Sequence, residues 1–247
     1  MNPQEQRWLA FDTSTDVLSL GVARGAQVWT QTLPGGAQSS AALIPAVLAM
    51  LAEAEMTLAS LDAIVMGRGP GSFTGLRTSC AVAQGLAFGA GIPVLPVDTL
   101  LAVAEEARFQ RVQSGSSDAD LTVLALLDAR MDEVYSATYR HVAGVAGGWQ
   151  AVSPLRVCAP QNLHAPADNV LLAGNAFDAY GERLAGGGER CPALPTAAAL
   201  LRLAPALWTQ GLAVPAEQAM PLYIRDKVAN TTAEREAMKA AAAQAAA

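Results

Sequence analysis

Charged side chains are scarce in this chain, and lysine is nearly absent from it. Only 15% of the 247 residues are charged, and 16 Lys and Arg residues stand against 22 Asp and Glu residues, which gives a net charge of -6. The first lysine along the chain is Lys227. Such a chain lacks the broad basic surface with which a protein binds RNA or DNA by itself.

Sulfur and imidazole ligands are also few. Cys80, Cys158 and Cys191 are odd in number, widely spaced and outside any CxxC pattern, which argues against a disulfide framework or a zinc site. His141 and His164 are the only histidines and do not stand at metal-ligand spacing, so a metal centre and a Ser-His-Asp triad are poorly supported. We therefore predict no catalytic residue, no metal and no cofactor.

Long apolar runs and a secretory leader are absent as well. The alanine-rich stretches are interrupted by Arg, Glu or Pro, and none approaches the roughly twenty apolar residues that a membrane span needs. The start of the chain, MNPQEQRWLAFD, has no basic region followed by an apolar run. We expect a cytoplasmic protein without a membrane span.

The chain does have a large apolar fraction, 52%, which is enough to build a substantial core at this length. Strand patterns and helix patterns alternate along it. A strand meander (WLAFD, VLSLGVARG, QVWTQTL) is followed by a helix at 40–56, a strand LDAIVMG, a helix at 72–90, a strand IPVLPVD and a further helix. This alternation predicts the α/β class, with mixed β-sheets flanked by helices.

The predicted domain boundary is the polar, Gly/Ser-rich stretch VQSGSSDAD at 112–120. It divides an N-terminal subdomain, 1–111, from a C-terminal subdomain, 121–228, in which strand and helix patterns resume. The alanine-rich remainder, 229–247, is predicted to be a low-complexity tail.

The two predicted subdomains begin alike. FDTSTDVLSLGVA and LDARMDEVYSATY each place an aspartate after an apolar strand and a second aspartate four residues later. Asp12 matches Asp128 and Asp16 matches Asp132, both at an offset of 116 (128 − 12 and 132 − 16). This repeat predicts a duplicated domain with a cleft between its halves, the architecture of actin and the sugar kinases. Neither turn contains the glycine that a phosphate would need, so we interpret these aspartates as turn-forming or helix-capping residues.

The glycine-rich turn in MGRGPGSFTGL suggests a phosphate loop and fails the test for one. A P-loop reads GxxxxGK[ST]. Counting from Gly67, Gly69 or Gly71, the second glycine position holds Ser72, Thr74 or Leu76. The required lysine is missing too. An anion nest formed by backbone N–H groups at the helix start remains an alternative.

The helix after this turn has a stripe of small residues at every fourth position: Gly75, Ser79, Ala83 and Ala87. Small side chains let another element approach closely, because their bulk sets the interaxial distance. Two interpretations stay open at this stage. The stripe packs against this chain's own sheet or first helix, or part of it meets the helix of a partner.

A resemblance to a known family is carried by three segments: GRGPGSFTGLRTSCAVAQGLAFGAGIPVLPVDTL, DARMDEVY and PLYIRD. Over most of residues 7–228, the chain resembles the TsaB (YeaZ) family of bacterial subunits for tRNA threonylcarbamoyladenosine synthesis. The resemblance implies a degenerate actin-like ATPase (ASKHA, ribonuclease-H-like) fold. It also implies a non-catalytic scaffold that activates the catalytic paralogue TsaD, with the ATPase TsaE recruited to the pair. Such a complex transfers threonylcarbamoyl to N6 of the adenosine 3′ of the anticodon in tRNAs reading ANN codons. By the same resemblance, tRNA is reached through the complex only.

This chain lacks histidines at positions where TsaD and members of the TsaB family carry them. TsaD carries an H-x-x-x-H metal-binding pair where PVDTLLAV places Thr99 and Val103 in this chain, and neither side chain ligates a metal as imidazole does. Family members often have a histidine just before the first helix, where this chain has Ser39.

The resemblance also implies that helices 40–56 and 72–90 form the interface with TsaD, and that a homodimer forms in its absence. The residues predicted for this interface are Leu43, Val47, Met50, Leu51, Gly75, Leu76, Ser79, Val82, Ala83, Leu86 and Ala87. The competing hypothesis is a small sugar-kinase-like or peptidase-like enzyme that uses the cleft between the halves.

Overall fold

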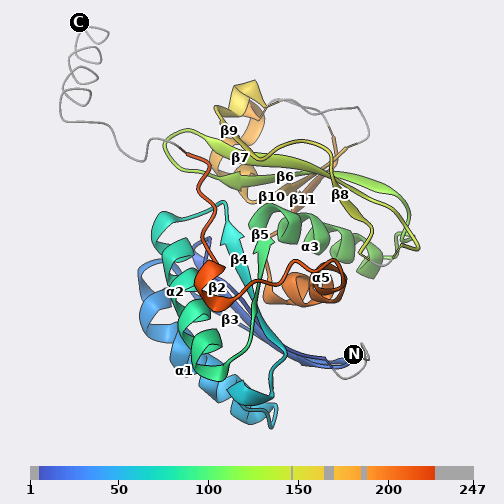
Figure 1. Ribbon diagram of the computed structural model, residues 1–247. Helices are drawn as coiled ribbons and strands as arrows, with labels where there is room; N and C mark the ends of the chain where they lie inside the picture. The colour runs from blue at the N-terminus through green and yellow to red at the C-terminus, as the bar shows by residue number, and fades with distance from the viewer. Residues whose placement is uncertain (1–5, 146, 164–169, 185–187, 226–247) are drawn as a thin grey trace, which may run out of the picture.

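The computed structural model describes residues 6–145, 147–163, 170–184 and 188–225, which form two mixed β-sheets with helices around and between them (Figure 1). The first sheet has the strand order β3-β2-β1-β4-β5. β1 pairs antiparallel with β2 and parallel with β4, which is parallel to β5 in turn. The strands of this sheet are β1 Arg7–Asp12, β2 Val17–Arg24, β3 Gln27–Pro34, β4 Ala63–Gly69 and β5 Val94–Asp98.

The second sheet repeats the topology of the first. Its order is β11-β10-β6-β7-β8, so an antiparallel meander is again extended by two parallel strands on the side of its first strand. Its strands are β6 Leu121–Asp128, β7 Val134–His141, β8 Trp149–Ala151, β9 Arg156–Cys158, β10 Leu171–Gly174 and β11 Arg190–Pro192. The predicted architecture of two similar halves, each with a mixed sheet, is confirmed.

The second meander is less regular than its sequence suggested. WQAVSPLRVC forms two short strands, β8 and β9, which pair with different parts of the same edge of β7. Pro154, which has no N–H to donate, lies between them. β11 is only three residues long and has no apolar alternation, which is why the sequence did not reveal it.

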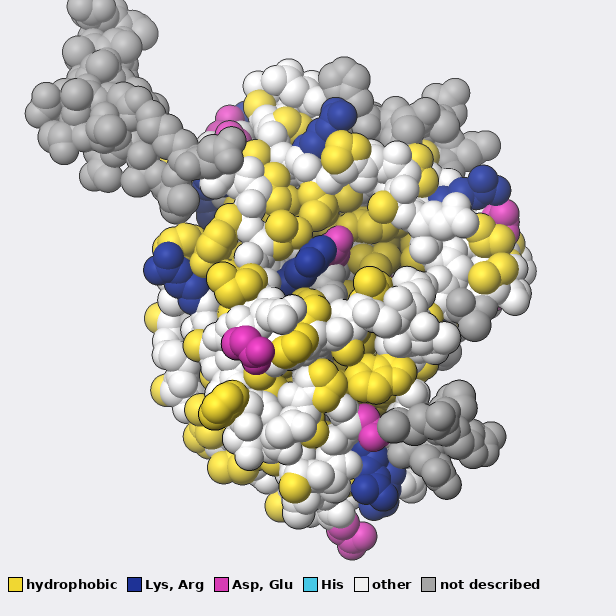
Figure 2. Space-filling view, in the orientation of Figure 1, with side chains coloured by type: hydrophobic (Ala, Val, Ile, Leu, Met, Phe, Trp, Pro, Cys, Tyr) yellow, Lys and Arg dark blue, Asp and Glu magenta, His cyan; other side chains and the backbone are white. Residues whose placement is uncertain are grey.

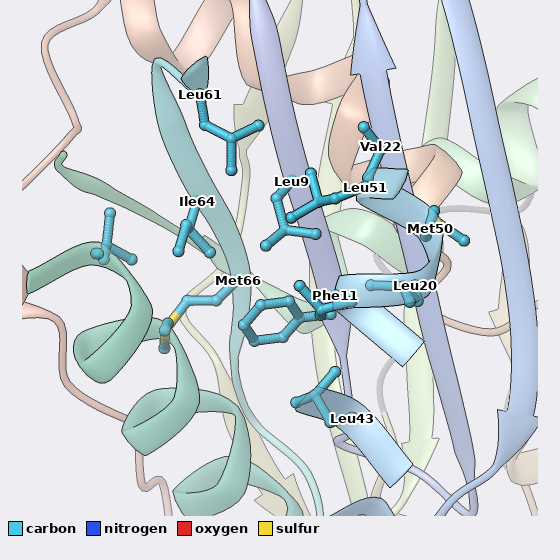
Figure 3. Packing of buried hydrophobic residues seen from close by; sticks show 14 of the residues in the cluster. Leu9, Phe11, Leu20, Val22, Leu43, Met50, Leu51, Leu61, Ile64 and Met66 are labelled. Atoms are coloured by element: carbon cyan, nitrogen blue, oxygen red, sulfur yellow. The ribbon is translucent and has the colours of Figure 1, made fainter. Parts of the chain in front are cut away.

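Two helices cover the outer face of the first sheet: α1 (Ser39–Glu53) and α2 (Phe73–Ala90). Side chains alternate along each strand, so β1 sends Leu9 and Phe11 to this side and Trp8 and Ala10 to the other. Figure 3 shows Phe11 facing Met66, with Leu43 and Leu51 of α1 packed nearby. The central strands β1 and β4 are thus buried on both faces, whereas the edge strand β3 is mostly exposed.

The other helices do not follow the predicted domain boundary. α3 (Thr99–Gln113) packs on β6 and β10 of the second sheet, whereas α5 (Ala197–Thr209) packs on β1 and β2 of the first. The two helices also pack on each other between the sheets (Figure 1). The division at 112–120 therefore separates the strands of the two sheets, while each half of the sequence supplies a helix to the sheet of the other. α3 also continues to Gln113, two residues into the predicted linker. The end of the predicted C-terminal subdomain, 226–228, and the predicted tail, 229–247, lie outside the described residues.

A buried ion-pair network joins α3, α5 and β8. The carboxylate of Glu105 on α3 accepts hydrogen bonds from Arg108, from Arg202 on α5 and from the indole N–H of Trp149, at 2.7–3.0 Å. Burial alone would raise the pKa of Glu105, but these donors outweigh it and hold the pKa below its usual value. Glu105 is therefore a charged, fully bonded anchor between the halves.

The small-residue stripe of α2 faces this chain itself. A Cβ added at Gly75 would lie 1.9 Å from the carbonyl oxygen of Thr13, whose hydroxyl donates to the Gly75 carbonyl at 2.7 Å. Ser79 donates to the carbonyl of Gly67, and Ala83 is fully buried against the first sheet. The first of the two interpretations of the stripe is the one that the structure shows.

Replacing two glycines of the same helix should have opposite effects. Gly75→Ala should lower the free energy of unfolding by about 3 kcal/mol, because the new methyl group collides with backbone that cannot yield. Gly85→Ala should raise it by about 1 kcal/mol, because a Cβ there meets nothing within 4 Å and alanine is the better helix former. Denaturant titration of both variants measures the difference. Equal effects of the two substitutions would mean that the Thr13 carbonyl does not lie against Gly75.

Candidate functional site

The two matched aspartates form the same turn at the ends of β1 and β6. Asp12 Oδ1 accepts from the backbone N–H of Ser14, and Asp128 Oδ1 accepts from that of Arg130, both at 2.8 Å. This is the local bond by which aspartate stabilises a turn. The interpretation of both residues as turn-forming is confirmed, and the two turns face the space between the halves.

The surroundings of the two carboxylates differ strongly. Asp12 is fully buried, and its hydrogen bonds come from uncharged groups: Ser14 and, at 3.4 Å, the hydroxyl of Thr99. A Cβ added at Gly67 would lie 1.8 Å from Asp12 Oδ2, so this glycine of the glycine-rich turn leaves room for a carboxylate of the same chain. Burial raises the pKa of Asp12 to about 6, against the lowering effect of these hydrogen bonds.

Asp128 is instead paired with a cation. Arg130 binds its Oδ2 at 3.1 Å, and the hydroxyl of Tyr180 donates to its Oδ1 at 2.7 Å. Burial and the bond to Asp128 raise the pKa of Tyr180 to about 12, so the phenol remains a protonated donor at neutral pH. The guanidinium of Arg130 also reaches Asp16, across the space between the halves.

A cavity of about 250 Å³ lies between the two turns. Its walls come from both turns, from the start of α2 and from residues 222–225; among them are Ser14, Asp16, Ser72, Asp128, Arg130 and Arg225. Both arginines of this lining are paired with carboxylates, Arg130 with Asp16 and Asp128 and Arg225 with Glu133. The described lining therefore offers no uncompensated cation to a phosphate group.

The start of α2 is also occupied by its own chain. The N–H of Ser72 donates to the Ser14 carbonyl at 2.7 Å, and the Ser72 hydroxyl caps the helix by accepting from Gly75. Within the described ranges, which include His141 but not His164, no group of three or more His, Cys, Asp or Glu side chains could hold a metal.

The residues predicted for a partner interface lie mostly inside this chain. Val82 and Leu86 are partly buried, and the other nine are buried: Leu43, Val47, Met50, Leu51, Gly75, Leu76, Ser79, Ala83 and Ala87. A side chain enclosed by its own sheet has no surface to offer a partner, so the prediction chose the inward faces of α1 and α2. Ser39 is buried too, as the first residue of α1.

The outward faces of these helices are the surface that the sequence reasoning missed. Every exposed residue of α1 from Ala41 to Ala52 is apolar, and Ile44 and Leu48 are 42% and 52% exposed. On α2, Phe88 is 80% exposed beside the small residues Ala81 and Gly85. Hydrophobic side chains reach the surface at the lower left of Figure 2, where α1 and α2 lie. We call this surface, formed by the exposed residues of α1 and α2, the outer helix face.

Segment Gly36–Glu53 is long and apolar enough to cross a membrane by length and composition alone, with a mean hydropathy of 1.2. Only 28% of it is buried. The buried share packs on the first sheet through residues such as Leu43 and Val47, as in a core helix. The rest of this apolar segment belongs to the outer helix face.

Comparison with known proteins decides the family. A family profile described as TsaD, tRNA N6-adenosine threonylcarbamoyltransferase, matches residues 34–233. The protein named tRNA threonylcarbamoyladenosine biosynthesis protein TsaB from Haemophilus influenzae is 34% identical, over 89% of this chain and 94% of its own length. Its namesake from Escherichia coli is 30% identical, over 90% and 96%. The chain belongs to the TsaB (YeaZ) family.

The solved structure of YeaZ from Pseudomonas aeruginosa extends the likeness to the fold. It superimposes with a TM-score of 0.79 at 35% identity and covers 88% of this chain and 99% of its own. With the duplicated topology, this confirms the actin-like (ASKHA) fold predicted for this TsaB-family chain. The two positions matched to the TsaD histidines are buried here: Thr99 donates to Asp12, and Val103 lies in the core between α3 and the second sheet.

The titration of Asp12 gives a test of its burial. Its folded pKa, about 6, is above the ordinary value of 3.8, so its contribution to stability is full below pH 3.8 and is lost as the pH rises to about 6. This loss amounts to about 3 kcal/mol. Asp12→Asn removes this titration. The free energy of unfolding of the variant, relative to that of the wild type, should therefore rise by about 3 kcal/mol between pH 4 and pH 7. Denaturant unfolding across this range measures it, and parallel pH profiles would show that Asp12 is not buried.

Proposed function

We propose that this chain is a non-catalytic scaffold and activating subunit of a cytoplasmic complex for tRNA threonylcarbamoyladenosine synthesis. In this proposal it binds the catalytic paralogue TsaD, and the pair recruits the ATPase TsaE. The complex then transfers threonylcarbamoyl to N6 of the adenosine 3′ of the anticodon in tRNAs that read ANN codons. The names of the relatives support the pathway, and the net charge of -6 supports contact with tRNA through the complex only.

The observation that carries the proposal is the outer helix face. Surface helices of globular proteins normally present charged and polar residues to solvent, yet the exposed residues of α1 from Ala41 to Ala52 include none. A continuous apolar patch of this kind marks an interaction site. Phe88 and Leu48 would serve as anchors, while Gly85 and Gly89, with open space at their Cβ positions, let a partner helix approach closely.

The partner that fits best is TsaD, because the TsaD profile matches this chain over residues 34–233 and related halves bring similar helices to a shared surface. In the absence of TsaD, the same face is expected to pair with a second copy. The cleft supports a non-catalytic role, because its arginines are already paired within this chain and Asp12 is fully buried, outside the cavity lining.

A charge placed on the outer helix face should separate the complex. Leu48→Glu and Phe88→Glu should each weaken TsaD binding by about thirtyfold or more, the loss typical of a buried anchor. Both variants should keep the wild-type melting temperature. Co-purification with TsaD and the level of the modified nucleoside in cells measure the effect. Val152→Glu is the matched control, since Val152 is 55% exposed on the other half. If both outer-face variants retain TsaD and the modification, the interface assignment is wrong.

Nucleotide binding distinguishes the proposal from the enzyme hypothesis. Titration calorimetry of the isolated chain with Mg-ATP should give no binding at micromolar concentrations, because the cleft arginines are neutralised. Micromolar binding that disappears in Asp12→Asn or Asp128→Asn would instead establish a kinase-like use of the cleft.

A further inference from the structure

After α5 the chain returns along the first half as an irregular segment, residues 212–225, which contains a short 3-10 helix, Ala216–Gln218, and which we call the strap. Val214 pairs with Val94 at the edge of β5 through two backbone hydrogen bonds of 2.8 and 2.9 Å. The carbonyl of Ala219 accepts from Cys80 Sγ and Gln84 Nε2 of α2, at 3.0 and 2.9 Å. One end of the strap is therefore fixed to the first half.

The other end of the strap reaches the second half. Leu222 donates to the carbonyl of Arg68 at 2.7 Å, still on the first half. Three residues later, the guanidinium of Arg225 binds the carboxylate of Glu133 and donates to the carbonyl of Ala129 at 3.0 Å, both in the β6–β7 turn. The Arg225 side chain is 15% exposed and the Glu133 side chain is 37% exposed, so this pair is partly shielded from solvent.

The turn that Arg225 holds is intrinsically unfavourable. Arg130, Met131 and Asp132 have φ values of 58°, 54° and 63°, three consecutive non-glycine residues in the left-handed region. Each such residue is disfavoured, and a run of them persists only where the surroundings hold it. Arg225 supplies part of that hold, because it bonds carbonyl and carboxylate groups on both sides of the run.

A second bond crosses the cleft beside the strap, from Arg130 to Asp16. These side chains are 68% and 78% exposed, and ion pairs this exposed contribute little and are screened by salt. The less exposed Arg225 contact is therefore the stronger of the two. On the far side of the cleft the halves are joined by the α3–α5 layer and Glu105.

We propose that the strap is a latch: Arg225 holds the two halves closed over the cleft, and its release lets them swing apart about the α3–α5 layer. Hinged opening of two lobes about a packed layer is a common motion in two-domain proteins. The inference concerns the isolated chain, so it holds or fails independently of the proposed role with TsaD.

Hydrogen exchange of the full chain, followed by mass spectrometry, tests the latch. In Arg225→Ala, peptides covering 13–17 and 69–73 should exchange about tenfold faster, the factor that loss of one charged hydrogen bond gives. These peptides line the cavity on the first half and are not bonded to Arg225. Glu133→Gln keeps the shape of the partner and should give the same pattern to a smaller degree. It also provides the test should Arg225→Ala fold poorly.

Arg183→Ala is the matched control. Arg183 forms two bonds to Asp132 in the same turn, at 2.6 and 2.7 Å, but both residues belong to the second half. This variant should leave exchange at 13–17 unchanged. Arg130→Ala, or about 0.5 M NaCl on wild type, should change it by less than about twofold.

Two outcomes would overturn the latch. One is faster exchange confined to the strap and the β6–β7 turn in both Arg225→Ala and Glu133→Gln, which would show local fraying without opening. The other is an equal effect of Arg183→Ala at 13–17, which would show that loosening the turn, and not releasing the strap, exposes the cavity.

Discussion

The carboxylate of Glu105 is the interaction on which the arrangement of this molecule depends. It lies between the two sheets, where α3, α5 and β8 meet, and it is bonded by Arg108, Arg202 and Trp149. A buried charge is tolerated only when it is paired and its hydrogen bonds are made. The groups that bond the buried charge of Glu105 bring together a helix from each half of the sequence, α3 and α5, and β8 of the second meander. Glu105 joins the halves on one side of the cleft, and Arg225 joins them on the other.

Duplication supplied two similar turns, and their surroundings made them different. Both carry an aspartate that bonds the backbone two residues on, but Asp12 is sealed among uncharged groups while Asp128 is paired with Arg130. In a nucleotide-binding cleft both turns would be open to phosphate and metal. In this chain the space between them is lined by its own ion pairs and by the strap. The resulting molecule keeps the layout of an ATPase but places its own residues in the cleft.

Four of the large hydrophobic side chains that the described part of the chain exposes lie on α1 and α2: Ile44, Leu48, Phe73 and Phe88. α1 is apolar on two sides, one buried on the first sheet and the other exposed. The exposed side of α2 is apolar around Phe88 and carries Thr74 and Arg77 nearer the start of the helix. A helix that is hydrophobic all round belongs in an interior, and the interior completed by the outer helix face is, in our proposal, that of a complex. The small residues of α2 serve both sides: Gly75 admits the Thr13 carbonyl, while Gly85 leaves open space outside.

The sequence by itself determined most of the strand and helix order, the duplication and the family, because these depend on local periodicity and on contiguous motifs. It missed β11 and showed β8 and β9 as one strand. It also showed that the glycine-rich turn is no P-loop, since the lysine is simply missing. Only the tertiary structure decided which faces of α1 and α2 are buried, which sheet each of α3 and α5 covers, and what Arg225 holds. These depend on contacts between residues far apart in the chain: Arg225 and Glu133 are 92 positions apart, and Arg202 and Glu105 are 97 apart. Periodicity along one helix cannot show which of two apolar sides its own sheet will cover.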